Sequence, residues 1–191
     1  FNAAQITDAI EERRRNRIDG LGVSPAPQDR VSAVRERMAD AGLDGFLVPL
    51  ADEHQGEFIA RRSQRLSWLT GFGGSAGLAV VLQDEAAIFV DGRYTLQVRT
   101  QVDTETFVPL QLTKTPPESW IRDHLSEGDN LGFDPWLHTP ASAKRLRDAC
   151  VSCGVELVAI QNNPVDEAWS DQPPSPLSPI HLQDEEFAGI D

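Results

Sequence analysis

The sequence has few cysteines and no long apolar run. Two cysteines among 191 residues are too few for a disulfide framework, which fits a reducing compartment. No apolar stretch approaches the roughly 20 residues that a helix needs to cross a bilayer. Residues 1–20 also lack the apolar core and the small-residue cleavage site of a signal peptide. We therefore predict a cytoplasmic protein with no membrane segment.

The sequence also has fewer basic than acidic residues. Lysine and arginine total 17 against 30 aspartates and glutamates, which gives a formal net charge of −13. This balance repels phosphate backbones and anionic lipid headgroups. We therefore expect neither nucleic acid nor a membrane surface as a partner.

What the sequence does contain is the composition of a soluble globular domain, with 40% hydrophobic and 25% charged residues. Strand-like runs alternate along it with stretches of helical periodicity. We expect helices at 28–41, 92–102, 117–125 and 140–153, the last two begun by Thr115 and Thr139 as caps. We expect strands at 44–50, 78–90 (a hairpin turning at Asp84-Glu85), 105–112, 130–134 and 155–160. The predicted fold class is α/β, with a mixed β-sheet flanked by helices.

The two ends of the chain differ from this pattern. Residues 1–27 are polar and are expected to form an N-terminal extension that is largely helical. Five of the thirteen prolines lie at or after Pro164, which is typical of a linker. We therefore expect an α/β domain over residues 28–164, followed at 165–191 by a proline-rich linker into a second domain that this chain lacks.

Two motifs suggest chemistry but are better explained by structure. Cys150 and Cys153 share a helical stripe with Leu146, which places both thiols toward the core at a helix end. Redox Cys-x-x-Cys pairs lie instead at a helix N-terminus, and no further ligands complete a zinc site. The run "GFGGSAG" at 71–77 lacks the Gly-Lys-Ser/Thr ending of a phosphate loop and the flanking glycines of a nucleophile elbow. Its glycines are expected to allow positive φ and close backbone approach.

Polar residues that follow strands are the remaining candidates. His54 lies in the loop "LADEHQGEFI", where ligand sites on open α/β sheets tend to occur, and could either bind a ligand or structure the loop. Asp52, Asp91 and Asp134 lack the companions that a metal needs, and Asp91 is expected to form a turn. Arg93 should project from the sheet's end near Gly73-Gly74. Its guanidinium could bind a carboxylate or carbonyl group of a ligand, or form a structural salt bridge.

Several ordered blocks carry a resemblance to a known family. They are "VPLADEHQGEFIA", "RLSWLTGFGGSAGLAVVL", "AAIFVDGRYTLQV", "LGFDPWLHT" and "NPVDEAWSDQPPSPLSPI". Together they resemble the N-terminal domain of long-form Xaa-Pro aminopeptidase (aminopeptidase P), of the creatinase N-terminal family, over roughly residues 28–191. The resemblance implies a mixed sheet with flanking helices, in agreement with the pattern above.

The resemblance also implies that different domains carry out catalysis and contribute to substrate binding. In the family, a C-terminal domain holds two divalent metal ions, usually manganese, and hydrolyses the bond before a proline at the second position. This chain ends before that domain, so we expect it to bind no catalytic metal, to contain no catalytic residue and to be inactive alone. The family's Asp-Gly-Arg-Tyr arginine contacts the peptide substrate, a role that falls on Arg93, and His54 is a weaker candidate for the same cleft. The whole protein is expected to be a homodimer.

Two alternatives remain open at the level of sequence. The parent protein could be another hydrolase of the creatinase superfamily, such as a prolidase or creatinase. It could also be an interaction module with a peptidase-like fold and no catalysis, as in the large subunit of the FACT histone chaperone. Metal-ligand carboxylates and histidine in the downstream sequence would indicate an enzyme, and their lack would indicate a binding module.

Overall fold

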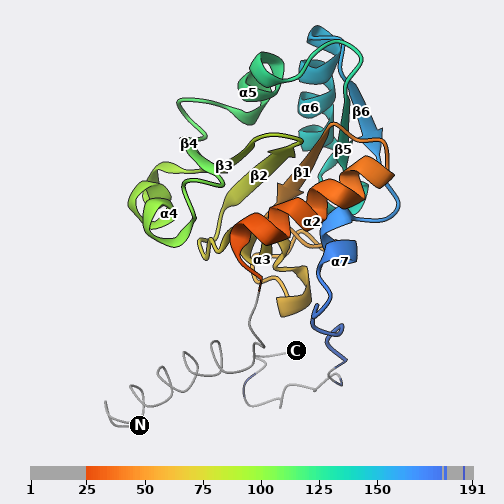
Figure 1. Ribbon diagram of the computed structural model, residues 1–191. Coiled ribbons are helices and arrows are strands. Elements are labelled where there is room, and N and C mark those ends of the chain that lie inside the picture. The colour runs from red at the N-terminus through yellow and green to blue at the C-terminus, as the bar shows by residue number, and fades with distance from the viewer. Residues whose placement is uncertain (1–24, 178, 180–186, 188–191) are drawn as a thin grey trace.

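The computed structural model describes residues 25–177, 179 and 187. Residues 1–24 of the N-terminal extension that we expected to be largely helical lie outside the described residues. The described chain forms one six-stranded sheet in the order β4-β3-β2-β1-β5-β6, with helices on both of its faces (Figure 1). Within this part of the chain, no helix has the length and apolar character required to cross a membrane.

The sheet is mixed, because one strand opposes the other five. The strands are β1 (Gly45–Pro49), β2 (Gly77–Leu82), β3 (Ala86–Val90), β4 (Val108–Gln111), β5 (Asn130–Phe133) and β6 (Glu156–Ala159). Strand β2 pairs antiparallel with both β1 and β3, whereas the β3–β4, β1–β5 and β5–β6 pairs are parallel. The predicted fold class and the hairpin are therefore confirmed.

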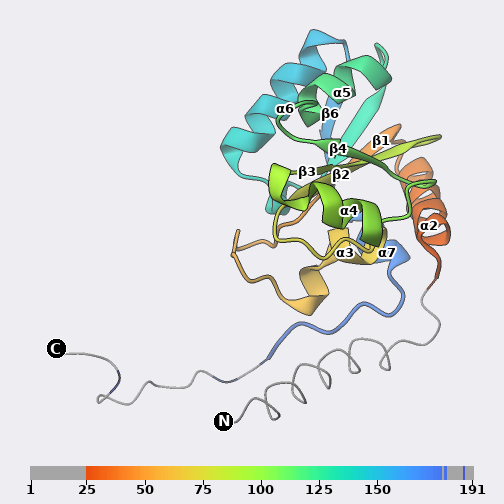
Figure 2. The same cartoon turned by 90° about the vertical axis from the view of Figure 1, so that its left-hand side faces the viewer.

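Helices cover the sheet as two separate layers. The α-helices are α2 (Pro27–Asp40), α3 (Arg65–Thr70), α4 (Thr95–Gln101), α5 (Pro117–His124), α6 (Pro140–Ser152) and α7 (Pro164–Ala168). Three 3₁₀ turns, η1 (Arg61–Ser63), η2 (Gly92–Tyr94) and η3 (Pro135–Leu137), lie in the connections. Figure 2 shows α5 and α6 on one side of the sheet and α2 on the other.

The alternation of side chains along the strands builds two hydrophobic cores. On β1, Phe46 and Val48 face the core beneath α2 and α3, whereas Leu47 faces the core beneath α5 and α6. On β3, Ile88 and Phe89 divide in the same way. Because successive strand residues point to opposite faces, these nearly continuous apolar strands are buried on both sides.

Three local features differ from the sequence expectation. Helix α5 has Pro116 at its N-cap and no side-chain cap, so the predicted capping by Thr115 is wrong. Helix α3 was not expected, since its apolar pattern spans under two turns. Helix α7 was not expected either; it begins at Pro164 and packs against α2 and α3, where Trp169 stacks on Trp68 with ring centroids 5.3 Å apart.

Candidate functional site

The strand directions bring most of the candidate residues to one edge of the sheet. Strands β1, β3, β4, β5 and β6 all end at this edge, which we call the carboxyl edge, and β2 begins there. The loops that leave it contain His54, Arg93 and Asp134. In open α/β sheets, ligands bind outside the carboxyl ends of the strands, so this edge is the candidate site.

Three aspartates form the same kind of turn within three residues of the ends of three of these strands. The carboxylate of Asp52 accepts hydrogen bonds from the main-chain nitrogens of His54 and Gly56, at 3.1 and 2.9 Å. Asp91 accepts from the nitrogen of Arg93 at 2.8 Å, and Asp134 accepts from that of its second neighbour at 3.0 Å. Short acidic side chains favour such turns because they bond to the backbone two residues on. The prediction that Asp91 forms a turn is confirmed.

Arg93 lies in η2 and forms the salt bridge that the sequence offered as one of its two roles. Its Nε and Nη2 atoms donate to the Asp91 carboxylate, with Nη2 2.6 Å from Oδ2, and these bonds lower the pKa of Asp91. Yet 70% of the Arg93 side chain is exposed. Nη1 has no hydrogen-bonding partner within the described part of the chain. The salt bridge therefore orients the guanidinium while one of its nitrogens stays available to a ligand.

Tyr94 and Ser75 connect this arginine to the glycine-rich turn. The hydroxyl groups of Tyr94 and Ser75 are 2.6 Å apart, and this bond lowers the pKa of Tyr94. The Arg93 guanidinium lies 5.3 Å from the centre of the Tyr94 ring, which meets Phe72 edge-on at 5.5 Å. Sequence reasoning missed both residues, although the adjacency of Arg93 and Tyr94 is a signal that could have indicated the tyrosine.

Two glycines of the turn, Gly71 and Gly74, have the roles that the sequence predicted. Gly71 ends α3 in the left-handed conformation, at φ 78°. A Cβ on Gly74 would lie 2.2 Å from the ring of Phe72, so only glycine fits without a shift of the aromatic ring. The turn therefore packs under the Arg93 loop as a support.

His54 is held by its backbone and directs its side chain to solvent. The Asp52 turn fixes its main chain, while 81% of the side chain is exposed and its Nε2 lies 4.0 Å from Glu53. Among the described residues no hydrogen bond, ion pair or ring contact joins His54 to Arg93. The two candidates thus share the carboxyl edge but are not joined by a hydrogen bond, ion pair or ring contact.

The described residues do not offer a metal centre. No group of three or more histidine, cysteine, aspartate or glutamate side chains is placed among them to hold a metal ion. Cys150 and Cys153 are free, and burial raises the pKa of the Cys150 thiol to about 11. Such a thiol stays protonated at neutral pH and behaves as a core side chain, as its helical stripe predicted.

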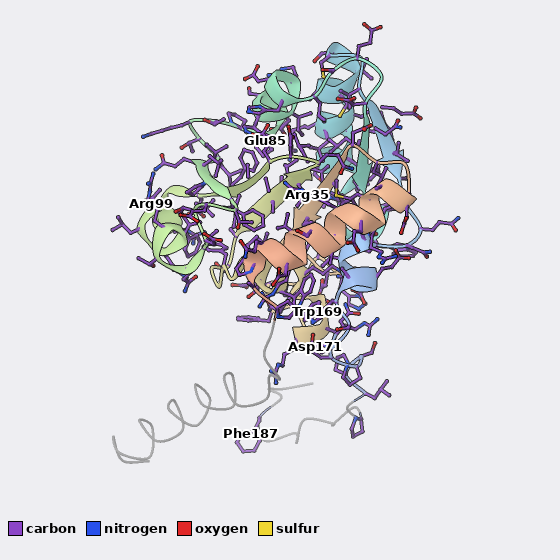
Figure 3. All side chains as sticks on the ribbon, viewed as in Figure 1. Arg35, Glu85, Arg99, Trp169, Asp171 and Phe187 are labelled. Carbon is purple, nitrogen blue, oxygen red and sulfur yellow. The ribbon has the colours of Figure 1, made fainter. Side chains whose placement is uncertain are left out.

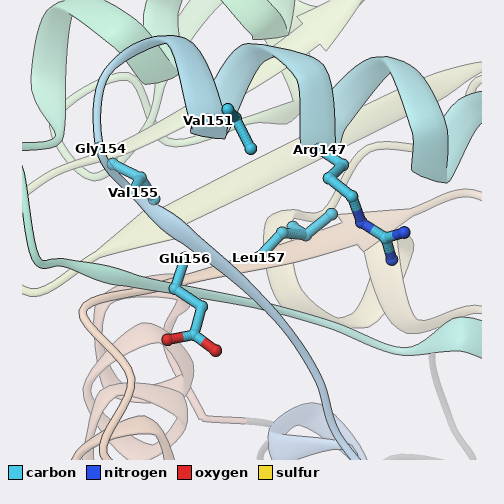
Figure 4. Close-up of a pocket in the computed structure, with 6 residues that line it drawn as sticks. All are labelled: Arg147, Val151, Gly154, Val155, Glu156 and Leu157. Carbon is cyan, nitrogen blue, oxygen red and sulfur yellow. The ribbon is translucent and has the colours of Figure 1, made fainter.

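A hollow between α6 and β6 lies away from the candidate site. It is lined by Arg147, Val151, Gly154, Val155, Glu156 and Leu157 (Figure 4). These residues surround the beginning of β6, at the opposite end of that strand from the carboxyl edge. The only charged groups in its lining are Arg147 and Glu156, so we assign no site there.

Comparison with known protein families gives one match over most of the chain. Residues 30–167 match the Creatinase/Prolidase N-terminal domain. Xaa-Pro aminopeptidase 2 of Rattus norvegicus is 34% identical over 161 residues, which are 84% of this chain and 24% of the relative. Aminopeptidase P2 of Arabidopsis thaliana is 37% identical over 169 residues, 85% of this chain and 24% of the relative. The chain thus spans about a quarter of the length of these relatives.

Two solved structures are also similar to this chain. An X-prolyl aminopeptidase from Caenorhabditis elegans, described as a cytosolic enzyme with a di-nuclear active site, matches with a TM-score of 0.72 and 27% identity. The match covers 78% of this chain and 26% of that enzyme. The N-terminal domain of the cytoplasmic peptidase PepQ from Mycobacterium tuberculosis matches in fold, with a TM-score of 0.57 and 24% identity over 73% of this chain and 98% of that one.

Proposed function

Because the chain belongs to the Creatinase/Prolidase N-terminal domain family, we propose that it is the non-catalytic N-terminal domain of a metallo-aminopeptidase that removes the residue before a proline. The observation that carries this proposal is the identity of 34–37% to Xaa-Pro aminopeptidases over 84–85% of the chain. Since those relatives are about four times longer, the hydrolytic chemistry belongs to another part of the protein.

Arg93 is the residue through which this domain contacts the peptide. Its guanidinium is exposed at the carboxyl edge, is oriented by Asp91 and keeps Nη1 available. A planar guanidinium binds carbonyl and carboxylate oxygens with defined geometry. His54, at the same edge, has an exposed side chain and is a second, weaker contact.

The proposal places the metal pair of the family outside this chain, and it is supported by the lack of any group of three or more metal-ligating side chains among the described residues. The C. elegans relative is described as an enzyme with a di-nuclear active site, and this chain matches 26% of its length, so the proposal assigns the metal pair and the catalytic steps to the part of the enzyme that this chain does not cover. That relative's description as cytosolic supports a cytoplasmic location for the longer protein. Its assembly as a homodimer stays a prediction.

The test is peptide hydrolysis by the longer protein with manganese, beside two variants. In Arg93→Ala, loss of a charge-assisted contact worth about 1.5–3 kcal/mol should lower kcat/KM roughly ten- to a hundredfold. Arg99→Ala is the matched control, because Arg99 is also an exposed arginine and lies on α4 directly after η2 (Figure 3). It should retain kcat/KM within about twofold.

Two other outcomes would contradict the proposal. Equal losses in the Arg93 and Arg99 variants would indicate a general charge effect rather than a contact made by Arg93. Absence of Xaa-Pro cleavage in the unaltered longer protein would instead favour the interaction module without catalysis.

A further inference from the structure

A second concave site opens at the carboxyl edge, on the face of the sheet that α5 and α6 cover. It has a volume of about 390 Å³, within the range of small-ligand sites. Its walls come from the end of β1, the beginning of β2, the segment after β4 and the first turns of α5 and α6. Its apolar lining includes five leucines, and we call it the leucine pocket: Leu50, Leu78, Leu112, Leu137 and Leu146.

Polar groups are added to this apolar lining by the first turns of α5 and α6. Glu118 of α5 and Arg145 of α6 lie with Oε1 and Nε 3.6 Å apart, a loose pair in which 66% of the Arg145 side chain is exposed. His138 also lines the pocket, and its Nε2 is buried without a hydrogen-bonding partner among the described residues. The lining thus offers one carboxylate and one guanidinium beside an apolar surface.

The leucine pocket adjoins the loop that carries Arg93. The main-chain nitrogen of Leu112 donates to the carbonyl of Val90 at 2.9 Å, and Val90 is three residues before Arg93. Leu78 is the register partner of Phe89 on the neighbouring strand. The pocket and the Arg93 loop therefore adjoin the same edge of the sheet.

We propose that the leucine pocket binds an apolar side chain of the peptide substrate, on the C-terminal side of its proline. This inference rests on the proposed function and names a preference within it. A peptide presents one N–H donor and one C=O acceptor per residue, which match the Glu118 carboxylate and the Arg145 guanidinium. Because the charges of Glu118 and Arg145 cancel, the pocket suits a residue with an uncharged side chain better than it suits a small free ion.

The kinetic test uses the longer protein and the hexapeptide Ala-Pro-Ala-Ala-Ala-Ala. Four further peptides each place one leucine at the third, fourth, fifth or sixth position. Burial of the leucine side chain should raise kcat/KM roughly tenfold at one of these positions and leave the others near the alanine value. Equal kcat/KM for all five peptides, with cleavage intact, would overturn the leucine pocket as a subsite.

Two variants with matched controls assign the preference to this pocket. Ser142→Phe places a ring in the pocket lining and should abolish the leucine preference, whereas Ala141→Phe, at the neighbouring exposed position outside the lining, should keep it. Arg145→Ala removes one rim group and should weaken the preference, whereas Arg147→Ala on the same helix should not. Arg145 is largely exposed, so this variant remains informative if the Ser142 variant fails to fold.

A binding measurement on the 191-residue chain separates this inference from the proposed function. Titration of the labelled chain with the preferred hexapeptide should shift the NMR signals of Leu78, Leu112 and Ser142, and the all-alanine peptide should shift them far less. If these signals shift while the longer protein cleaves no Xaa-Pro peptide, the proposed function is wrong and the pocket is a peptide site of another activity. If cleavage is intact and the signals do not shift, the pocket assignment is wrong.

Discussion

The carboxylate of Asp91 accepts hydrogen bonds from both the main chain and the side chain of Arg93. Oδ1 lies 2.8 Å from the main-chain nitrogen, and Oδ2 lies 2.6 Å from Nη2. One side chain thus fixes the turn after β3 and the direction of the guanidinium that the turn carries. This double contact explains how an arginine that is 70% exposed can keep a defined orientation.

Asp91→Asn should separate these two contacts. The amide oxygen can still accept from the Arg93 nitrogen, but the charge that orients the guanidinium is lost. We expect kcat/KM of the longer protein for Xaa-Pro peptides to fall by roughly three- to tenfold, less than in Arg93→Ala. The free energy of unfolding should change little, because the Arg93 guanidinium of the pair is largely exposed to solvent.

Asp103→Asn is the control for this variant. Asp103 forms the same kind of turn, accepting from the nitrogen of Glu105 at 3.0 Å, but it pairs with no arginine in the described part of the chain. Its kcat/KM should be unchanged. A similar loss in both variants would mean that turn geometry, rather than the charge beside Arg93, controls activity.

Gly74→Ala should destabilise the chain through the ring of Phe72. The added methyl group would lie 2.2 Å from that ring, and overpacking of this kind costs about 1–3 kcal/mol. Gly92→Ala is the matched substitution, because nothing lies within 4 Å of its added Cβ. Urea denaturation should show a loss for Gly74→Ala and a change within about 0.5 kcal/mol for Gly92→Ala; equal stabilities would contradict the close packing of Phe72 under the turn.

Asp166→Ala should detach α7 from the domain. Arg65 donates to Asp166 through Nε at 2.7 Å and Nη2 at 2.8 Å, and only 9% of its side chain is exposed. Removal of the carboxylate leaves a buried charge unpaired, which costs about 3–5 kcal/mol.

The exposed pair of Lys144 and Asp148 gives the contrast for that prediction. Asp148→Ala should cost less than about 1 kcal/mol in the same denaturation experiment. If Asp166→Ala were equally mild, α7 would not depend on its salt bridge, and the stacking of Trp169 on Trp68 would be the main attachment.

His138 should make stability depend on pH on the acidic side of neutrality. Burial lowers its pKa from 6.5, opposed by the nearby Asp134. The unfolded chain therefore binds this proton more readily than the folded chain does, so the contribution to stability is complete above pH 6.5 and is lost as pH falls through the lower folded pKa. Denaturation at pH 7.5 and pH 5 should show a smaller pH difference for His138→Phe than for the unaltered chain; an equal difference would indicate that His138 charges freely in the folded state.

Much of the fold could be predicted because its signals are local. The alternation of strands and helices gave the α/β class, and the close spacing of two apolar runs gave the hairpin of β2 and β3. The cap at Thr139, which accepts from the nitrogen of Ser142 at 3.2 Å, follows from residues three positions apart. The turn at Asp91 is equally local, since a short acidic side chain bonds to the backbone two residues on.

Short helices were missed because their stability does not come from their own sequence. Helix α7 has only five residues, and isolated helices of that length are unstable in water. It does carry a helix-start signal, with Asn163 as N-cap and Pro164 at the first position, but the proline-rich composition that follows suggested a linker. Its stacking on Trp68 and its ion pair with Arg65 depend on residues about 100 positions away.

The sequence by itself determined the local conformation of each turn, because the glycines and aspartates that set it act on residues close to them in the chain. Only the tertiary structure decided that the turns meet. The strand order places the ends of β1, β3, β4 and β5 at one edge of the sheet. At this edge the hydroxyl groups of Ser75 and Tyr94, 19 residues apart in the chain, form a hydrogen bond, and Leu112 bonds to Val90. Such contacts depend on the pairing of all six strands and on the burial of both faces of the sheet. No short stretch of sequence therefore contains the information that specifies them.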